Sequence, residues 1–149
     1  MKPVSLLTVV ALFTSFTASA NFSECQKKLF GYGGLTGTQA AKFCKDQSSS
    51  EFVHCQNTLF RYGGVTGTQA AKFCLENASA DFINCQNKLF RYGGVTGTQA
   101  GTFCKKQSDA EFVSCQNDHF AHGGLTGTQA AKFCSKDYES SEPQPTTWN

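Results

Sequence analysis

The chain has 149 residues, a formal net charge of +2 and 16% charged residues. A balance so close to neutral, without clustered Lys or Arg, argues against a nucleic-acid-binding protein of the usual basic kind. After the N-terminal apolar run, no segment approaches the roughly 20 consecutive apolar residues that a membrane-spanning helix needs.

The chain begins with a pattern typical of an export signal. Lys2 precedes an apolar run from Leu6 to Phe16, and Ala18-Ser19-Ala20 is a small-x-small cleavage site. We therefore expect a signal peptide over residues 1–20 and a secreted or periplasmic/extracellular mature protein. In an oxidising compartment its cysteines would pair as disulfides.

Near-copies of one 30-residue unit fill the rest of the chain. A fixed period this short is typical of an array of small supersecondary units. The four repeats together predict one helical-hairpin domain over residues 21–136, and the acidic, Pro-containing segment 137–149 predicts a disordered tail. The repeats cover residues 21–50, 51–80, 81–110 and 111–136.

Each repeat predicts two short helices, as the second repeat illustrates. Its first helix has an apolar half-wheel, and Gly63-Gly64 should end that helix. Thr66 and Gln69 then form an S/T-x-x-E/Q capping box, which starts the second helix. A short loop makes such helices antiparallel, as an αα-hairpin. The expected apolar half-wheel consists of Phe52, Val53, Cys55, Leu59, Phe60 and Tyr62.

The predicted fold class is all-α: four tandem disulfide-stapled αα-hairpin repeats with eight short helices, stacked as a small solenoid or a compact bundle. Two connections between repeats carry further candidate capping boxes, Ser48 to Glu51 and Ser108 to Glu111, and Asn77 to Ser79 offers less regular caps. Burial between repeats should come from three series of phenylalanines: Phe22, Phe52, Phe82 and Phe112; Phe30, Phe60, Phe90 and Phe120; Phe43, Phe73, Phe103 and Phe133.

The eight cysteines fit two pairing schemes. Cys55 and Cys74 are equally far from their hairpin turn, roughly 12 Å at the rise of a helix, which favours one disulfide within each repeat. The alternative joins neighbouring repeats, for example Cys44 to Cys55, and leaves Cys25 and Cys134 at opposite ends. The favoured pairs are Cys25–Cys44, Cys55–Cys74, Cys85–Cys104 and Cys115–Cys134.

The hairpin loop, Tyr-Gly-Gly-Leu/Val-Thr-Gly-Thr-Gln, is almost unchanged in all repeats, whereas the linkers differ. Helix termination and capping alone would constrain this loop, and a Gly-rich turn before a helix can also contact a ligand. It lacks the Lys of a P-loop. The candidate binding-loop residues are Tyr32, Thr36, Tyr62, Thr66, Tyr92, Thr96, His122 and Thr126.

Several further positions carry hypotheses. Gln26, Gln56, Gln86 and Gln116 fall in the apolar arc of the first helix, so we expect their amides to bond loop backbone atoms of their own or the next repeat. The last repeat differs by Asp118, His119 and His122, which form a weak candidate metal site; the favoured explanation is a terminal repeat that is atypical because it caps the stack. Arg61, Arg91, Lys72 and Lys132 could form a basic stripe or be solvated charges. Asn21 and Asn77 lie in glycosylation sequons.

The function that fits best is a secreted, non-enzymatic binding or structural scaffold, acting through the repeated loops and an outer helical face on an unknown protein or surface ligand. No cofactor is expected, and no catalytic Ser/His/Asp or Cys/His set recurs in the repeats. The alternatives are a small membrane-active or toxin-like protein and, less favoured, a thiol-redox or metal-binding protein. The sequence leaves the oligomeric state open.

Overall fold

The computed structural model describes residues 17–137, which form helices and short loops without any strand. The predicted tail lies outside these residues except for Asp137. Most of the predicted signal peptide also lies outside them, and its cleavage site after Ala20 falls within the first helix. The helices are α1 (Thr17–Tyr32), α2 (Gly37–Asp46), α3 (Ser50–Tyr62), α4 (Gly67–Glu76), α5 (Ala80–Tyr92), α6 (Gly97–Lys106), α7 (Ala110–Ala121) and α8 (Gly127–Phe133).

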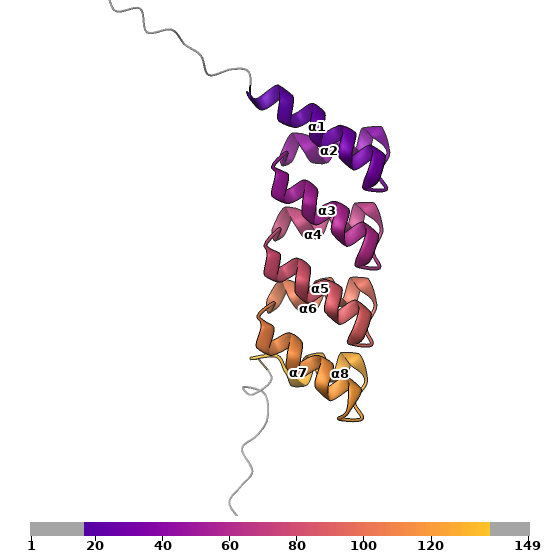
Figure 1. Ribbon diagram of the computed structural model, residues 1–149, viewed down its shortest axis with the longest axis vertical. Helices are drawn as coiled ribbons and strands as arrows, with labels where there is room; N and C mark the ends of the chain where they lie inside the picture. Colours follow the sequence, from indigo (N-terminus) through magenta and orange to yellow (C-terminus); the bar gives the residue numbers. More distant parts are fainter. Residues whose placement is uncertain (1–16, 138–149) are drawn as a thin grey trace, which may run out of the picture.

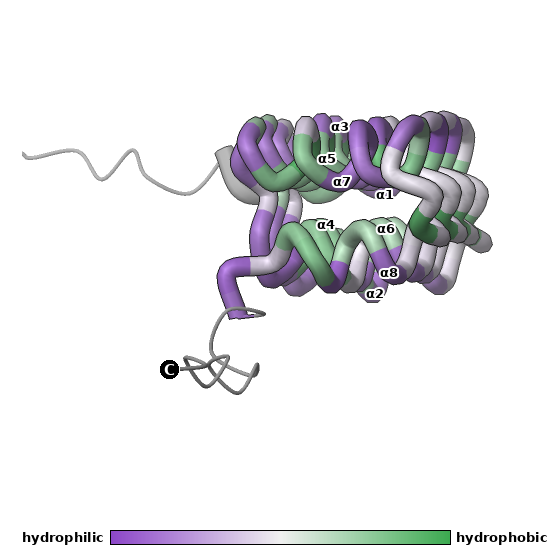
Figure 2. Tube along the Cα trace, turned by 90° about the horizontal axis from the view of Figure 1, so that it is seen from below, coloured by the Kyte–Doolittle hydropathy of each residue, from purple (hydrophilic) through white to green (hydrophobic). Residues whose placement is uncertain are grey.

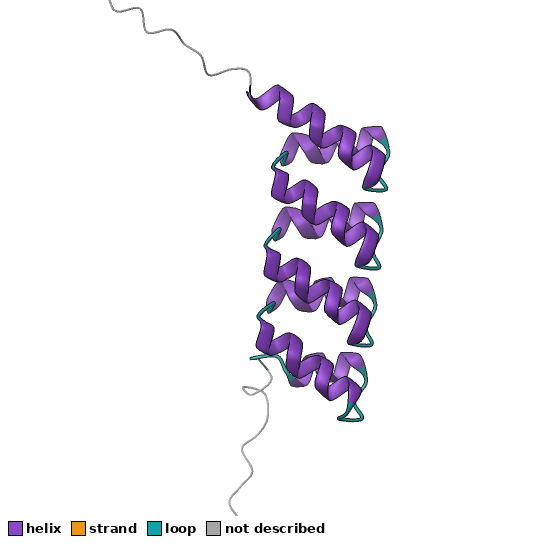
Figure 3. Cartoon of the chain, in the orientation of Figure 1, coloured by secondary structure: helices purple, strands orange, loops and turns teal. Residues whose placement is uncertain are grey.

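The four hairpins stack in a row, with each repeat beside the next one along the chain (Figure 1). Helices α1, α3, α5 and α7 form one layer, which we call the first-helix layer, and α2, α4, α6 and α8 form the second-helix layer (Figure 2). The hairpin loops gather along one edge of the stack and the linkers along the other (Figure 3). The arrangement is a small two-layered solenoid.

The predicted pairing of cysteines within each repeat is confirmed. All four bridges, Cys25–Cys44, Cys55–Cys74, Cys85–Cys104 and Cys115–Cys134, join Cα atoms 5.8 Å apart, and there is no free cysteine among the described residues. Four disulfides indicate folding in an oxidising environment. Within residues 17–137, no helix combines the length and apolar character needed to traverse a bilayer.

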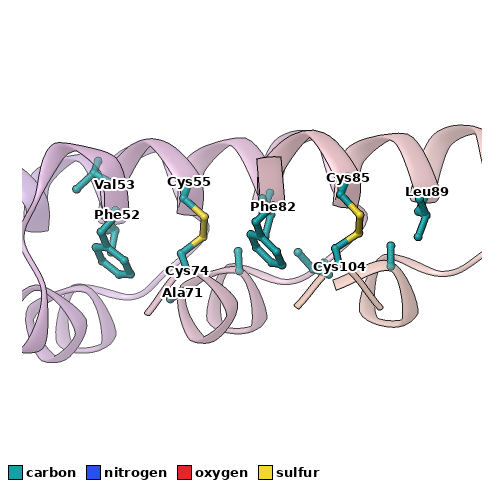
Figure 4. Close-up of a cluster of buried hydrophobic side chains, with 14 of the residues drawn as sticks. Phe52, Val53, Cys55, Ala71, Cys74, Phe82, Cys85, Leu89 and Cys104 are labelled. Carbon is teal, nitrogen blue, oxygen red and sulfur yellow. A yellow bond between two sulfur atoms is a disulfide. The ribbon is translucent and has the colours of Figure 1, made fainter. Parts of the chain in front are cut away.

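The core lies between the two layers, where buried phenylalanines alternate with disulfides (Figure 4). Phe52 and Phe82 are fully buried, and the ring centroids of Phe73 and Phe82 are 6.3 Å apart across a repeat boundary. Two short helices alone bury little apolar surface. A single hairpin is therefore too small to be stable without its disulfide.

The expectation that three phenylalanine series are buried between repeats is correct for only part of the set. Phe52, Phe82 and Phe112 are buried, while Phe60 is 37% exposed because it lies at the edge of the stack, against Gly34 of the preceding loop. Tyr62, expected on the apolar face, is 49% exposed. It is the last residue of α3, and its side chain lines a surface groove between α1 and α3 instead of the core.

The two capping boxes expected in the linkers are wrong by one residue. The helix α3 begins one position later than Ser48 would require, so Ser49 is its N-cap and its hydroxyl accepts the N–H of Phe52 at 3.2 Å. Asp109 plays the same part for α7, at 2.9 Å from the N–H of Phe112, in place of Ser108. Ser79 caps α5.

In the first two linkers, the side chain of the residue that ends one helix contacts the N-cap of the next. Gln47 is the C-cap of α2, and its Oε1 accepts the N–H of Ser49 at 3.3 Å. Asn77 repeats the contact with Ser79 at 3.0 Å. In the third linker, Gln107 Oε1 instead accepts the N–H of Lys136 at 3.0 Å, and Asp109 still caps α7. The contact therefore supports the N-cap in the first two linkers but does not by itself determine its position.

Reduction of the disulfides tests the dependence on covalent bridges. Each bridge closes a loop with a sequence separation of 19 residues, worth about 3 kcal/mol in the chain-entropy model. We expect full reduction to lower the melting temperature and to remove much of the helical far-UV circular dichroism. A reduced and alkylated protein that kept both would contradict this account.

Candidate binding surface and the loops that support it

The hairpin loop is built from backbone groups that the sequence motif satisfies locally. Gly63 ends α3, and Gly64 follows with a φ of +65°, a left-handed conformation that favours glycine. The hydroxyl of Thr66 then accepts the N–H of Gln69 at 3.3 Å, and Gln69 Oε1 accepts the N–H of Thr66 at 3.0 Å. The predicted capping box is confirmed here and in α2, α6 and α8.

A buried glutamine in each of α3, α5 and α7 joins the loop of its own repeat to the loop of the preceding repeat. Gln56 is fully buried, and its Nε2 donates to the carbonyl oxygens of Gly33 at 2.7 Å and Gly67 at 3.1 Å. The same pair of bonds recurs at Gln86 and Gln116. The expectation that these amides bond backbone atoms of their own repeat's loop is confirmed. The expectation of a bond to the next repeat is wrong, because the second partner is a glycine of the preceding repeat.

Gly67 permits this close approach of successive loops. A Cβ added to Gly67 would overlap the carbonyl oxygen of Gly33, and one added to Gly33 would overlap Gln56 Oε1. Gly97 and Gly127 lie in the same way against the loops before them. Packing between repeats therefore explains most of the constancy of the loop sequence, because only glycine fits at these positions.

The glutamine network is not complete. The Oε1 atoms of Gln56, Gln86 and Gln116 lie buried without a donor among the residues that the structure describes. Because an unpartnered buried oxygen costs free energy, the net stabilisation from each glutamine is smaller than its two donated bonds alone would give. The two bonds still satisfy carbonyls that would otherwise be buried without a partner.

The large side chains exposed beside the loops are the tyrosines that precede the glycines. Tyr32, Tyr62 and Tyr92, which we call the tyrosine row, are 60%, 49% and 64% exposed. The guanidinium of Arg61 lies 5.5 Å from the ring centroid of Tyr32, and that of Arg91 lies 5.4 Å from Tyr62. Cation–π pairs thus link successive repeats on the surface and hold two of the three rings in place.

These Arg–Tyr pairs were not predicted from the sequence, although a constant spacing between a tyrosine and the arginine of the next repeat indicates them. Arg61 and Arg91 each stand 29 positions after a tyrosine, whereas the equivalent position of the last repeat is Ala121. The arginines belong to the first-helix layer, and Lys72 and Lys132 to the second, so the hypothetical basic stripe does not form as one row.

Shallow grooves run beside the tyrosine row on the first-helix layer. One groove of 610 Å³ lies between α1 and α3, with Tyr32, Arg61 and Tyr62 among the residues that line it. A second, of 540 Å³, lies between α5 and α7, with Tyr92 and His122 at its side. Among the candidate loop residues, these tyrosines and His122 line the grooves, whereas the four threonines act as helix N-caps.

The candidate metal ligands of the last repeat do not converge. His122 is exposed and ends α7, and the ring of His119 packs edge-on against Phe133 with centroids 4.7 Å apart. The group of possible ligand atoms that the described residues do bring together is Cys115, His119 and Cys134. Because its two sulfurs are joined in a disulfide, they are not thiolates that could bind a metal.

Asp109, the N-cap of α7, has a lowered pKa and also makes a contact between two segments of the last repeat region. The N–H of Phe112 lowers the pKa of the Asp109 carboxyl, and Lys136, whose Nζ lies 3.2 Å from Asp109 Oδ2, lowers it further. Asp109 thus ties the segment after α8 to the start of α7. The contact is structural and lies away from the tyrosine row.

Comparison of the chain with protein-family models, with curated proteins and with solved structures found no match.

Replacing Gln56 by Leu should lower the free energy of unfolding by about 1–3 kcal/mol, because the carbonyls of Gly33 and Gly67 lose their donor. Gln26 provides a matched control, since its Nε2 makes a single long bond of 3.4 Å to Gly37. Gln26→Leu should change stability by less than about 0.5 kcal/mol. Chemical denaturation of both variants, with disulfides intact, measures the difference, and equal effects would contradict the bridging role.

Proposed function

We propose that the protein is a secreted, non-enzymatic scaffold that binds an extended partner through the tyrosine row and the adjoining grooves of the first-helix layer. The observation that supports this best is the recurrence of an exposed tyrosine at the same place in three successive repeats. Tyrosine is enriched where proteins bind, since it offers a large contact area with few rotatable bonds.

The arginine contacts that hold two of the tyrosine rings in place also favour a role in binding. Arg61 and Arg91 restrain Tyr32 and Tyr62, so less side-chain entropy is lost when a partner orders them. The stack itself is rigid because disulfides close each hairpin and glutamines join neighbouring loops. Equivalent rings on a rigid support suit a partner that also repeats, since each contact raises the effective concentration of the next.

Affinity capture with the oxidised protein, from the extracellular or envelope fraction of its source, tests the proposal. We expect the captured partner to bind each single Tyr→Ala variant at positions 32, 62 and 92 about tenfold more weakly, and the triple variant far more weakly still. The rings are largely exposed, so each variant should keep the fold. Tyr32→Ala and Tyr62→Ala also lose a cation–π pair and should be less stable by about 0.5–1 kcal/mol, whereas Tyr92→Ala should match the parent.

Lys72→Ala, an exposed change on the second-helix layer, is the matched control and should bind as the parent does. A partner that the triple tyrosine variant retained at full affinity would place the binding surface elsewhere and overturn the proposal.

A lipid surface is the second candidate, because a row of phenylalanines, Phe30, Phe60, Phe90 and Phe120, is partly exposed along the stack. Against it, Phe60, Phe90 and Phe120 pack on glycines of the preceding loops, which leaves little free apolar surface to insert. Dye release from anionic vesicles, compared between the parent and Phe30→Ala, separates this candidate from the binding scaffold.

A further inference from the structure

The repeat boundaries inside the chain are nearly identical, and each end of the stack presents one half of such a boundary. Three contacts define the boundary between the first two repeats: Gln56 bonds to Gly33, the ring of Phe60 lies on Gly34, and Gly67 lies against the Gly33 carbonyl. The next two boundaries repeat all three contacts. One geometric operation therefore relates each repeat to the next.

The first repeat carries the receiving half of this boundary with nothing against it among the described residues. We call this half the N-terminal end face, formed by Phe22, Gln26, Phe30, Gly37 and Ala41. Phe30 is 63% exposed, whereas its equivalents Phe60, Phe90 and Phe120 are 37–38% exposed. A Cβ at Gly37 would meet no atom within 4 Å, although its equivalents meet the preceding loop.

A hollow in the N-terminal end face marks the place of the missing loop. It has a volume of 390 Å³ and is lined by Ser23, Gln26, Lys27, Phe30 and Gly37. At the internal boundaries the glycine-rich loop of the preceding repeat occupies the corresponding position. Gln26 bonds only its own loop, so the bond that Gln56 makes to a preceding glycine has no counterpart in the first repeat.

The last repeat carries the matching half, the C-terminal end face, formed by His119, Gly123, Gly124, Leu125 and Phe133. Gly123 is exposed, whereas its equivalents Gly33, Gly63 and Gly93 are buried under the next repeat. A Cβ on Gly124 would meet no atom within 4 Å, whereas at Gly34, Gly64 and Gly94 it would overlap a phenylalanine of the next repeat. Phe133 is 47% exposed, and its equivalent Phe73 packs on Gly101 and Phe82 of the following repeat. The glycine-rich loop of the last repeat is thus accessible, and it could fill the hollow of another copy.

We propose that the protein associates with itself head to tail, the C-terminal end face of one copy docking on the N-terminal end face of the next. Gln26 of one copy would donate to Gly123 of the other, Phe30 would cover Gly124, and Phe133 would pack on Phe22. The contact is heterologous and the stack is a nearly straight row (Figure 1), so the association forms open chains rather than closed rings.

Three departures from the internal pattern make the contact between copies weaker than a boundary within the chain. Ser23 replaces the Val or Ile of the other repeats, and His119 replaces a leucine that is fully buried elsewhere. Gly31 and His122 remove the arginine and the tyrosine that would pair across the contact. Association between copies also costs translational freedom that linked repeats do not lose, so it depends on concentration.

Sedimentation of the oxidised full chain tests the proposal. The average mass should rise between about 10 μM and about 1 mM, the range of weak specific association. Gly37→Leu should stay monomeric, because its side chain would fill the hollow, and should keep the fold, because Gly37 has ample space and no positive φ. Circular dichroism and thiol counting check the fold of each variant.

A mixing experiment tests whether the contact joins the C-terminal end face of one copy to the N-terminal end face of another. Gly37→Leu blocks the N-terminal end face, and Phe133→Glu blocks the C-terminal end face by placing a charge where a ring should pack. Each variant alone should be monomeric, and a mixture should form dimers and nothing larger. A parent that stays monomeric at about 1 mM, a mixture without dimers, or a Gly37→Leu variant that associates like the parent would each overturn the proposal.

Discussion

The stack depends on the hydrogen bonds from one buried glutamine amide to two glycine carbonyls, one in its own repeat and one in the preceding repeat. Successive loops approach so closely that a side chain larger than a hydrogen atom does not fit between them at Gly67. At that distance water cannot reach the carbonyls, so their hydrogen bonds must come from the protein. The glutamine supplies these bonds, and the glycines make room for them.

Disulfides and buried glutamines stabilise different parts of the structure. The disulfide acts within a hairpin, where two short helices share too little surface to remain paired unaided. The glutamine acts between hairpins, with help from the Tyr–Arg pairs and from an ion pair between Glu76 and Lys105. Because each repeat touches mainly its neighbours, the stability of the array is close to a sum of hairpin and boundary contributions.

The sequence predicts the helices, the hairpin caps and the cysteine pairs because these features depend on residues close together or on symmetry between repeats. It predicts the linker caps less well, because Ser48, Ser49 and Ser50 are chemically alike and each could serve as an N-cap. A helical wheel places Tyr62 on the apolar half but does not show that its ring lines a surface groove between two first helices. The Arg–Tyr pairs depend on the stacking offset between repeats, which a single repeat does not contain.

The uniformity of the boundaries has a consequence for how the protein can change in length. Every junction presents the same glutamine and the same loop, so removing residues 51–80 would bring Gly33 against Gln86, a partner equivalent to the one it lost. Unequal recombination within the gene would therefore lengthen or shorten the protein in steps of 30 residues without creating a mismatched junction. Selection can thus set the reach of the molecule by copy number alone, leaving its chemistry unchanged.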